Sequence, residues 1–285
     1  MEIPLKFTGK NDKGEQEKKM RLCSIASGSS GNCIYVGSDT THILVDVGIS
    51  GKRTKEGLMS LGVKADELDG IFITHEHADH ISGLGVLARK YGIPIYGTKN
   101  TLKAIRAASS VGEIDEDLFK EIEADTKITI KDLVVNPMRT SHDAADPVAY
   151  RISHGQQKLG IITDLGCYND YTVESLKGMN ALLLEANHDV KMLQVGPYPY
   201  YLKKRILGEK GHLSNELSGQ LLSRVLHDKM QMILLGHLSK ENNLPELAYE
   251  AVRVEIAMAD NKYKANDFPI RVAKRSDVSE IIEIA

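Results

Sequence analysis

Residues 70–83 read GIFITHEHADHISG, and this stretch decides the fold of the chain. The apolar run Ile71, Phe72 and Ile73 predicts a buried strand that ends at Thr74. Four potential metal ligands then follow within six residues: His75, His77, Asp79 and His80. A strand end that opens into a loop is where α/β folds place their chemistry. We therefore start from this motif and work outward.

The spacing of these side chains suits metal binding. An extended segment points His75 and His77 to the same side, because they flank a single residue. Asp79 and His80 lie on the turn beyond and can face a second ion. Neutral imidazole and carboxylate groups are ligands for Zn²⁺, Mn²⁺ or Fe²⁺. The alternative, surface histidines at the start of a helix, does not explain the buried strand directly before them.

From Met20 onward, apolar runs of strand length alternate with helical patterns. We predict strands at residues 22–26, 33–36, 42–47, 70–74, 95–97, 127–130, 133–138, 149–153, 158–163, 181–185 and 230–235. We predict helices at residues 53–61, 81–91, 100–108, 170–177, 215–226 and 246–259. These elements indicate an α/β fold with two packed sheets, covered by helices, in one domain of residues 20–285. The charged residues 1–19 are interpreted as an N-terminal extension.

The bulk composition excludes several classes of protein. The formal charge of −3 over 285 residues gives no overall basic character, so any nucleic-acid binding needs a local patch. The three cysteines (Cys23, Cys33 and Cys167) are too few and too far apart for a disulfide framework. No apolar run reaches the roughly 18 residues of a membrane span. We expect a cytoplasmic protein with reduced thiols and no membrane partner; the oligomeric state is left open.

The run His-x-His-x-Asp-His resembles the signature of the metallo-β-lactamase superfamily, and the resemblance extends over nearly the whole chain from Met20. It implies a four-layer αββα sandwich that holds two divalent metal ions. Four positions outside this run also match the family pattern, in chain order: Asp46 in ILVDVG, His142 in MRTSHDAADP, Asp164 in GIITDLG and His237 in MILLGHLS.

The resemblance also implies a role for each position. His75, His77 and His142 hold one ion; Asp79, His80 and His237 hold the other; Asp164 bridges both. Asp46 orients the metal loop through hydrogen bonds without binding metal. Two bridged ions lower the pKa of a shared water towards about 7, and the resulting hydroxide can attack a phosphodiester. A bridging carboxylate favours phosphoester hydrolysis, although thioester hydrolases of the superfamily use it too.

A second signal is Glu185 in ALLLEANHD together with His212 in GHLSN. This arrangement resembles that of the superfamily's nucleases, including the tRNA 3′-processing enzymes. A histidine oriented by a carboxylate can protonate the leaving alkoxide of a phosphodiester. We therefore assign catalytic roles to Glu185, His212 and Asp79, and place His188 close to the same site. A loop histidine that merely caps a helix is the alternative for His212.

Two further stretches are candidates for substrate binding. The Ser/Gly loop in CSIASGSSGNC, residues 23–33, can offer backbone N–H groups to a phosphate through Ser29, Ser30 and Asn32; a plain hairpin turn is the alternative. In residues 195–212, tyrosines precede Lys203, Lys204 and Arg205, so that bases could stack while cations meet phosphates. A solvated helical face is the alternative there.

The Ser/Gly loop, EANHD and GHLSN together resemble the bacterial YycJ/WalJ group of this superfamily, which implies a nuclease with 5′→3′ exonuclease activity on DNA. We therefore expect DNA, rather than RNA, as the nucleic-acid partner. Asp164 and His237 lie 73 residues apart (237 − 164), too close for a large inserted domain, so we expect an open groove. A thioester or lactone hydrolase of the same fold is the alternative function. A metal-dependent binding module is a third interpretation, which the full ligand set disfavours.

Overall fold

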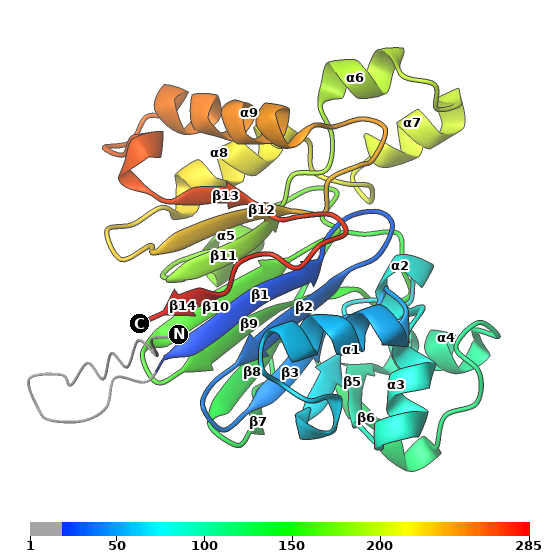
Figure 1. Cartoon of the computed structure of the whole chain (residues 1–285). Coiled ribbons are helices and arrows are strands. Elements are labelled where there is room, and N and C mark those ends of the chain that lie inside the picture. The colour runs from blue at the N-terminus through cyan, green and yellow to red at the C-terminus, as the bar shows by residue number, and fades with distance from the viewer. Residues whose placement is uncertain (1–18) are drawn as a thin grey trace, which may run out of the picture.

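The computed structural model describes residues 19–285 and consists of two seven-stranded sheets that pack face to face, with helices outside each sheet (Figure 1). This arrangement confirms the predicted αββα sandwich. The extension predicted over residues 1–19 lies outside the described residues, except for Lys19.

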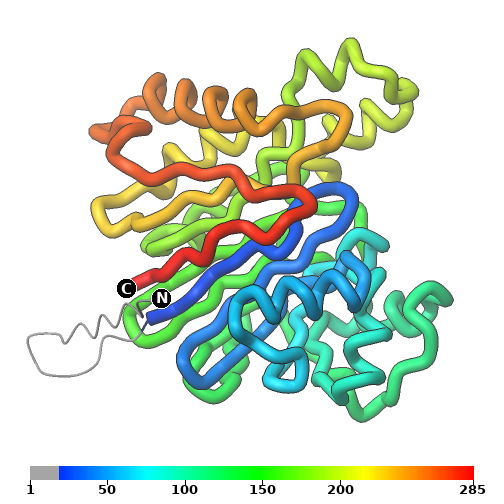
Figure 2. Tube along the Cα trace, in the orientation of Figure 1, coloured from blue at the N-terminus to red at the C-terminus, as the bar shows by residue number. Residues whose placement is uncertain are grey.

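The first sheet is antiparallel at one side and parallel at the other. Its strands in spatial order are β14 (Ile282–Ile284), β1 (Met20–Ala26), β2 (Cys33–Gly37), β3 (His42–Val45), β4 (Gly70–Phe72), β5 (Ile95–Thr98) and β6 (Phe119–Ile122). The strands β3 to β6 run parallel, whereas β14, β1, β2 and β3 pair antiparallel. The last strand therefore lies beside the first, as the tube in Figure 2 shows.

The second sheet repeats this mixture. Its strands in spatial order are β13 (Ile270–Val272), β12 (Met232–Gly236), β11 (Ala181–Glu185), β10 (Gln157–Ile162), β9 (Val148–His154), β8 (Leu133–Arg139) and β7 (Ile128–Ile130). The helices are α1 (Gly51–Ser60), α2 (Ala78–Ile81), α3 (Leu84–Tyr91), α4 (Lys99–Ala107), α5 (Asp170–Leu176), α6 (Val190–Val195), α7 (Tyr200–Ile206), α8 (Asn215–Val225) and α9 (Pro245–Met258).

Successive side chains of a strand point to opposite faces of its sheet. Apolar side chains therefore form three layers between the four layers of helices and sheets. In β11, Leu182 and Leu184 pack against the helices α5, α8 and α9, while Ala181 and Leu183 pack against the first sheet. Helices α1, α3 and α4 cover the other sheet through Leu58, Leu87, Leu102 and their neighbours. Burying each such leucine contributes about 1.5–3 kcal/mol, so the strands that carry the site are held on both faces.

The prediction of one continuous helix over residues 81–91 is wrong in one respect, because the structure divides this region between α2 and α3. The break falls at Gly83, whose N–H donates to the carbonyl of Val47 and where a Cβ atom would come within 2.0 Å of the Ile49 carbonyl oxygen. The strands β6, β13 and β14 and the helices α6 and α7 were not predicted. None of the helices in residues 19–285 combines the length and the apolarity that crossing a membrane requires.

Candidate metal centre

The candidate site lies where strands of both sheets end. Asp46 follows β3, His75 follows β4, Asp164 follows β10 and His237 follows β12. Three of these residues have left-handed backbone, with φ of 61° at Asp46, 49° at Asp164 and 54° at His237. Such a conformation is uncommon for residues other than glycine and costs of order 1–3 kcal/mol each. The surrounding packing thus holds three polar side chains against local backbone preference.

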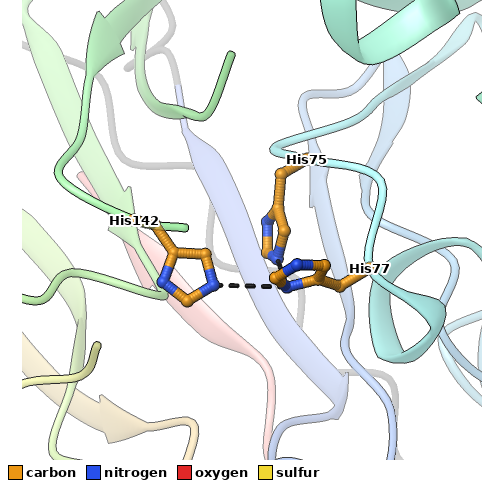
Figure 3. A group of neighbouring side chains, drawn as sticks. All are labelled: His75, His77 and His142. Atoms are coloured by element: carbon orange, nitrogen blue, oxygen red, sulfur yellow. Dashed lines mark hydrogen bonds between the residues drawn. The ribbon is translucent and has the colours of Figure 1, made fainter. Parts of the chain in front are cut away.

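Three histidines form one half of the centre, which we call the histidine half: His75, His77 and His142. The Nε2 atom of His75 lies 3.0 Å from Nδ1 of His77, and Nε2 of His142 lies 3.3 Å from the same atom (Figure 3). Tetrahedral nitrogen ligands about 2.05 Å from one zinc ion would stand about 3.3 Å apart. The spacing of the three nitrogens therefore fits a shared cation.

Neutral groups support the histidine half from behind. His142 Nδ1 donates to the carbonyl of Gly211 (3.0 Å), and His75 Nδ1 lies 3.0 Å from the Thr74 hydroxyl, which itself donates to Asp46. Because Nδ1 of each ring carries the donated proton, Nε2 of each ring has a free lone pair for a metal ion. Burial lowers the pKa of His142, and burial together with the charge of His80 lowers the pKa of His75 well below its usual value. Both imidazoles are therefore in the neutral form that binds metal.

Asp79, His80 and His237 form the other half, which we call the carboxylate half. Asp79 Oδ2 lies 3.5 Å from Nε2 of His80 and 3.5 Å from Nε2 of His237. Asp164 lies between the halves, with Oδ2 3.1 Å from His80 Nε2 and Oδ1 3.7 Å from His142 Nε2. A carboxylate in this position can bridge two ions.

Buried carboxylates support this half. Asp46 Oδ2 accepts from His80 Nδ1 (2.7 Å), and Glu185 Oε1 accepts from His237 Nδ1 (2.8 Å). Burial opposes a charge on His237, but Asp164, Asp79 and Glu185 outweigh it and raise its pKa to about 10. The pKa of His80 is likewise raised well above its usual value by Asp164, Asp46 and Asp79, against the effect of burial.

The residues present fit divalent cations. Asp164 Oδ2 is buried and lies 3.1 Å from His80 Nε2, whose other nitrogen already donates to Asp46. Two electron-rich atoms in contact need a proton or a cation between them. A neighbouring amide, Asn32 Nδ2, lies 3.1 Å from His80 Nε2 but has the Asp79 carbonyl as an alternative acceptor at 3.4 Å.

Glu185 orients His212 as well as His237. Its Oε1 atom accepts from His212 Nδ1 at 2.8 Å, while Oε2 accepts the backbone N–H groups of Leu165 (2.8 Å) and Leu213 (3.1 Å). Burial opposes ionisation of Glu185, but the charges and hydrogen bonds of His212 and His237 hold its pKa at about 2. One anion thus fixes two rings, a double role that the sequence did not indicate.

The remaining histidine predicted at the site, His188, is buried beside this cluster. Its Nδ1 atom lies 3.3 Å from Asn187 Oδ1, its Nε2 atom has no hydrogen-bond partner among residues 19–285, and burial lowers its pKa to about 4. Its ring therefore stays neutral and does not replace His212 as a proton donor near pH 7.

The Ser/Gly loop supports the metal centre from behind. Asn32 was expected to help bind a substrate phosphate, and the structure gives it this supporting role instead. Asn32 is fully buried and bonds to Gly28, so its side chain offers nothing to a substrate. Its backbone N–H donates to the Asp79 carbonyl (2.8 Å), and Ser27 Oγ accepts from the N–H of His237 (2.8 Å). Ser29 and Ser30 are exposed at the tip of the loop. The loop thus ties the metal motif to the exit of β12.

The basic stretch lies on α7, which projects with α6 beyond the sheets (Figure 1). Arg205 pairs with Asp143, the neighbour of His142, with Nη2 2.9 Å from Oδ1. Lys203 Nζ donates to the Gln194 carbonyl, and Lys204 is exposed. Tyr200 and Tyr201 are also exposed, so aromatic and cationic groups share this helix.

A polar pocket of about 630 Å³ opens beside His142, lined by Arg139, Ser141 and Lys210 among others. Its position next to the histidine half gives a substrate room on that side. The spacing of residues along the sequence gave no signal for this pocket, because its lining comes from three separate segments.

Comparison with known proteins agrees with this geometry. The family model of the Metallo-beta-lactamase superfamily matches residues 26–184. The chain is 42% identical to Exodeoxyribonuclease YycJ of Bacillus anthracis over 80% of this chain and 86% of that protein. It is 40% identical to Exodeoxyribonuclease WalJ of Streptococcus pneumoniae serotype 2 over 83% of this chain and 88% of that protein.

Among solved structures, the metallo-beta-lactamase fold protein YhfI from Bacillus subtilis superposes with a TM-score of 0.69 at 17% identity, covering 94% of this chain and 100% of that one. At this identity the likeness shows the fold alone. The chain belongs to the metallo-β-lactamase superfamily, within which it groups with the YycJ and WalJ proteins. It is a metal-dependent hydrolase.

Proposed function

We propose that this hydrolase is a dinuclear phosphodiesterase that degrades DNA as an exonuclease in the 5′→3′ direction. The observation that carries the proposal is the Glu185–His212 pair beside the metal centre. The thiolate of a thioester can leave without an acid to protonate it, whereas the alkoxide of a phosphodiester must be protonated. A buried carboxylate that orients a partly exposed histidine suits the second reaction.

Divalent ions held by the two halves would lower the pKa of a coordinated water and neutralise charge on the phosphate. The chain's own groups supply the rest. His212 is 15% exposed, and with Nδ1 donating to Glu185 its Nε2 atom carries the proton for the leaving oxygen. Glu185 stabilises the imidazolium before that transfer. Asp79, whose side chain is 27% exposed, lies beside His80 and can accept a hydrogen bond from the attacking water.

The names of the two relatives support DNA as the substrate, and the cations and tyrosines of α7 offer contacts for a strand. The buried free thiols Cys23 and Cys33 suit the cytoplasmic location that we propose with this activity.

The test is a nuclease assay with the full chain loaded with Zn²⁺, Mn²⁺ or Fe²⁺. Single- and double-stranded DNA, labelled at the 5′ or the 3′ end, and matched RNA serve as substrates. We expect mononucleotide release from a 5′-labelled strand at the earliest times. Release from the 3′ label first would reverse the polarity, preference for RNA would change the substrate, and no cleavage of either would overturn the nuclease.

The His212→Gln variant tests the proton donor. We expect DNA cleavage to fall about 10²–10⁴-fold, while bis-p-nitrophenyl phosphate, whose leaving group needs no proton, is hydrolysed at the parent rate. The matched control is His227→Gln, since His227 bonds to the Met179 carbonyl away from the ligands. Equal losses on both substrates would remove the general-acid role.

A further inference from the structure

The segment between β13 and β14 carries an arginine, Arg275, that forms no ion pair with any of residues 19–285. Arg275 is partly buried, and within residues 19–285 it makes neither a hydrogen bond nor an ion pair; its Nη1 atom is buried from solvent. Guanidinium groups have five N–H donors and cannot lose their charge in proteins. A buried donor without a partner costs free energy that an anionic ligand would recover.

This guanidinium borders the loop that braces the metal centre. A Cβ atom at Gly28 would lie 2.9 Å from Arg275 Nη1 and 3.2 Å from the Leu238 carbonyl oxygen, so the guanidinium group lies directly against the backbone of Gly28. Gly28 also pairs in an isolated parallel bridge with Leu238, the residue after His237. Arg275 therefore lies against the two segments that meet at the exit of β12.

Arg205, another guanidinium group near the centre, is already engaged. Arg205 pairs with Asp143, and besides that partner the field of Asp79 and Asp164 helps to raise its pKa. Burial lowers the pKa of Arg275, and the acidic groups that counter this are Tyr198 and Glu241. The position of Arg275 is thus beside the metal centre but outside it, as expected for a contact to a phosphate that is not the one cleaved.

We propose that Arg275, together with the exposed hydroxyl groups of Ser29 and Ser30, forms a phosphate-binding subsite next to the carboxylate half. The subsite rests on the proposed nuclease function and adds a second anchor to the strand. Guanidinium groups bind phosphate oxygens in pairs, which fixes direction as well as position. The ligand is either an internal phosphodiester or the terminal phosphate of the strand.

The experiment compares Arg275→Gln with Lys274→Gln, an exposed cation one residue away. We expect the KM for DNA to rise about tenfold for Arg275→Gln, with bis-p-nitrophenyl phosphate hydrolysed at the parent rate. In anisotropy titrations of single-stranded DNA with metal-free protein, the slope of log K against log salt should fall by about 0.7, the value for one lost phosphate contact. Lys274→Gln should leave the KM near that of the parent.

A second pair of substrates separates the two sources of phosphate. If Arg275 binds the terminal group, DNA with a 5′-phosphate is preferred over 5′-hydroxyl DNA by the parent and not by the variant. If it binds an internal phosphodiester, the variant loses affinity equally for both. The double variant Ser29→Ala with Ser30→Ala tests the loop without altering packing, and should raise the KM severalfold in the same direction.

Several outcomes overturn the subsite. An unchanged KM and salt slope in Arg275→Gln would do so, as would an equal loss on DNA and on the small ester, which would indicate a structural role. Thermal unfolding and the rescue expected from Arg275→Lys distinguish a misfolded variant from a lost contact. A parent that hydrolyses the small ester but neither binds nor cleaves DNA would refute the nuclease itself, together with the subsite.

Discussion

Both halves of the metal centre contain imidazole rings, but the two sets of rings lie in different electrostatic environments. In the histidine half, His75 and His142 are supported by a hydroxyl and a carbonyl group, and burial keeps them neutral. In the carboxylate half, His80 and His237 are supported by buried anions that raise their pKa. The difference indicates that one half is preformed for metal, whereas the other must exchange protons for it.

The largest effect is expected where the halves meet. Asp164→Ala removes the carboxylate between them, so we expect metal content to fall and hydrolysis of bis-p-nitrophenyl phosphate to drop by at least about 10³-fold, since metal ions contribute several kcal/mol to such reactions. Metal analysis and steady-state rates measure this, with the exposed Asp170→Ala as control. Retention of two ions per chain would show that the halves are independent sites.

Removing one supporting anion should lower the metal affinity of one half more than that of the other. Glu185→Gln keeps the shape of the side chain but loses the charge that holds His212 and His237, so we expect affinity for one ion to fall about 10–100-fold. Thr74→Val removes the hydroxyl group beside His75 and should weaken the other ion less. Because that hydroxyl group also donates to Asp46, a small loss in the carboxylate half is expected with it. Calorimetric metal titrations resolve the two events; equal losses in both variants would erase the proposed distinction.

Proton release provides a direct measure of the contrast. The raised pKa values of His237 (about 10) and His80 mean that metal binding to the carboxylate half displaces protons at pH 7, so its affinity should rise up to tenfold per pH unit for each proton displaced. The pKa of His75 and His142 is lowered, and binding there should release none. Titrations in buffers of different ionisation enthalpy count the protons. Equal release from both halves contradicts the assignment.

The smallest effect concerns the brace behind the carboxylate half. Asn32→Ala leaves buried partners at Gly28 unsatisfied, so the free energy of unfolding should fall by about 1–3 kcal/mol. Ser29→Ala, at the exposed tip of the same loop, should change it by less than about 0.5 kcal/mol. Chemical denaturation compares the two. A large loss in Ser29→Ala would mean that the tip is packed more tightly than the structure indicates.

Part of the centre could be predicted because four of its residues are nearly contiguous, and the resemblance to the metallo-β-lactamase superfamily indicated the rest. His75 to His80 lie within one turn and a strand end, and Asp46, Asp164 and His237 each follow an apolar run that reads as a strand. The two packed sheets followed from the same runs, since residues 181–184 of β11 and 232–235 of β12 are apolar on both faces of the strand.

What could not be predicted depends on the third dimension. The left-handed backbone at Asp164 has no sequence mark, since glycine is absent there. The inward turn of Asn32, the carbonyl of Gly211 behind His142 and the isolation of Arg275 all arise from segments far apart along the chain. The edge strands β6, β13 and β14 are too short for alternation to identify them.

The pairing of β14 with β1 has a consequence for the order of folding. Met20 pairs with Ile284, so one edge of β1 is covered only after residues 282–284 have been added. Every proposed ligand precedes β13, and the centre can therefore assemble around an incomplete sheet. Contacts of such long sequence separation form slowly. An unpaired β1 edge offers its N–H and C=O groups to other chains, so truncation before β14 should produce aggregation rather than a simple loss of activity.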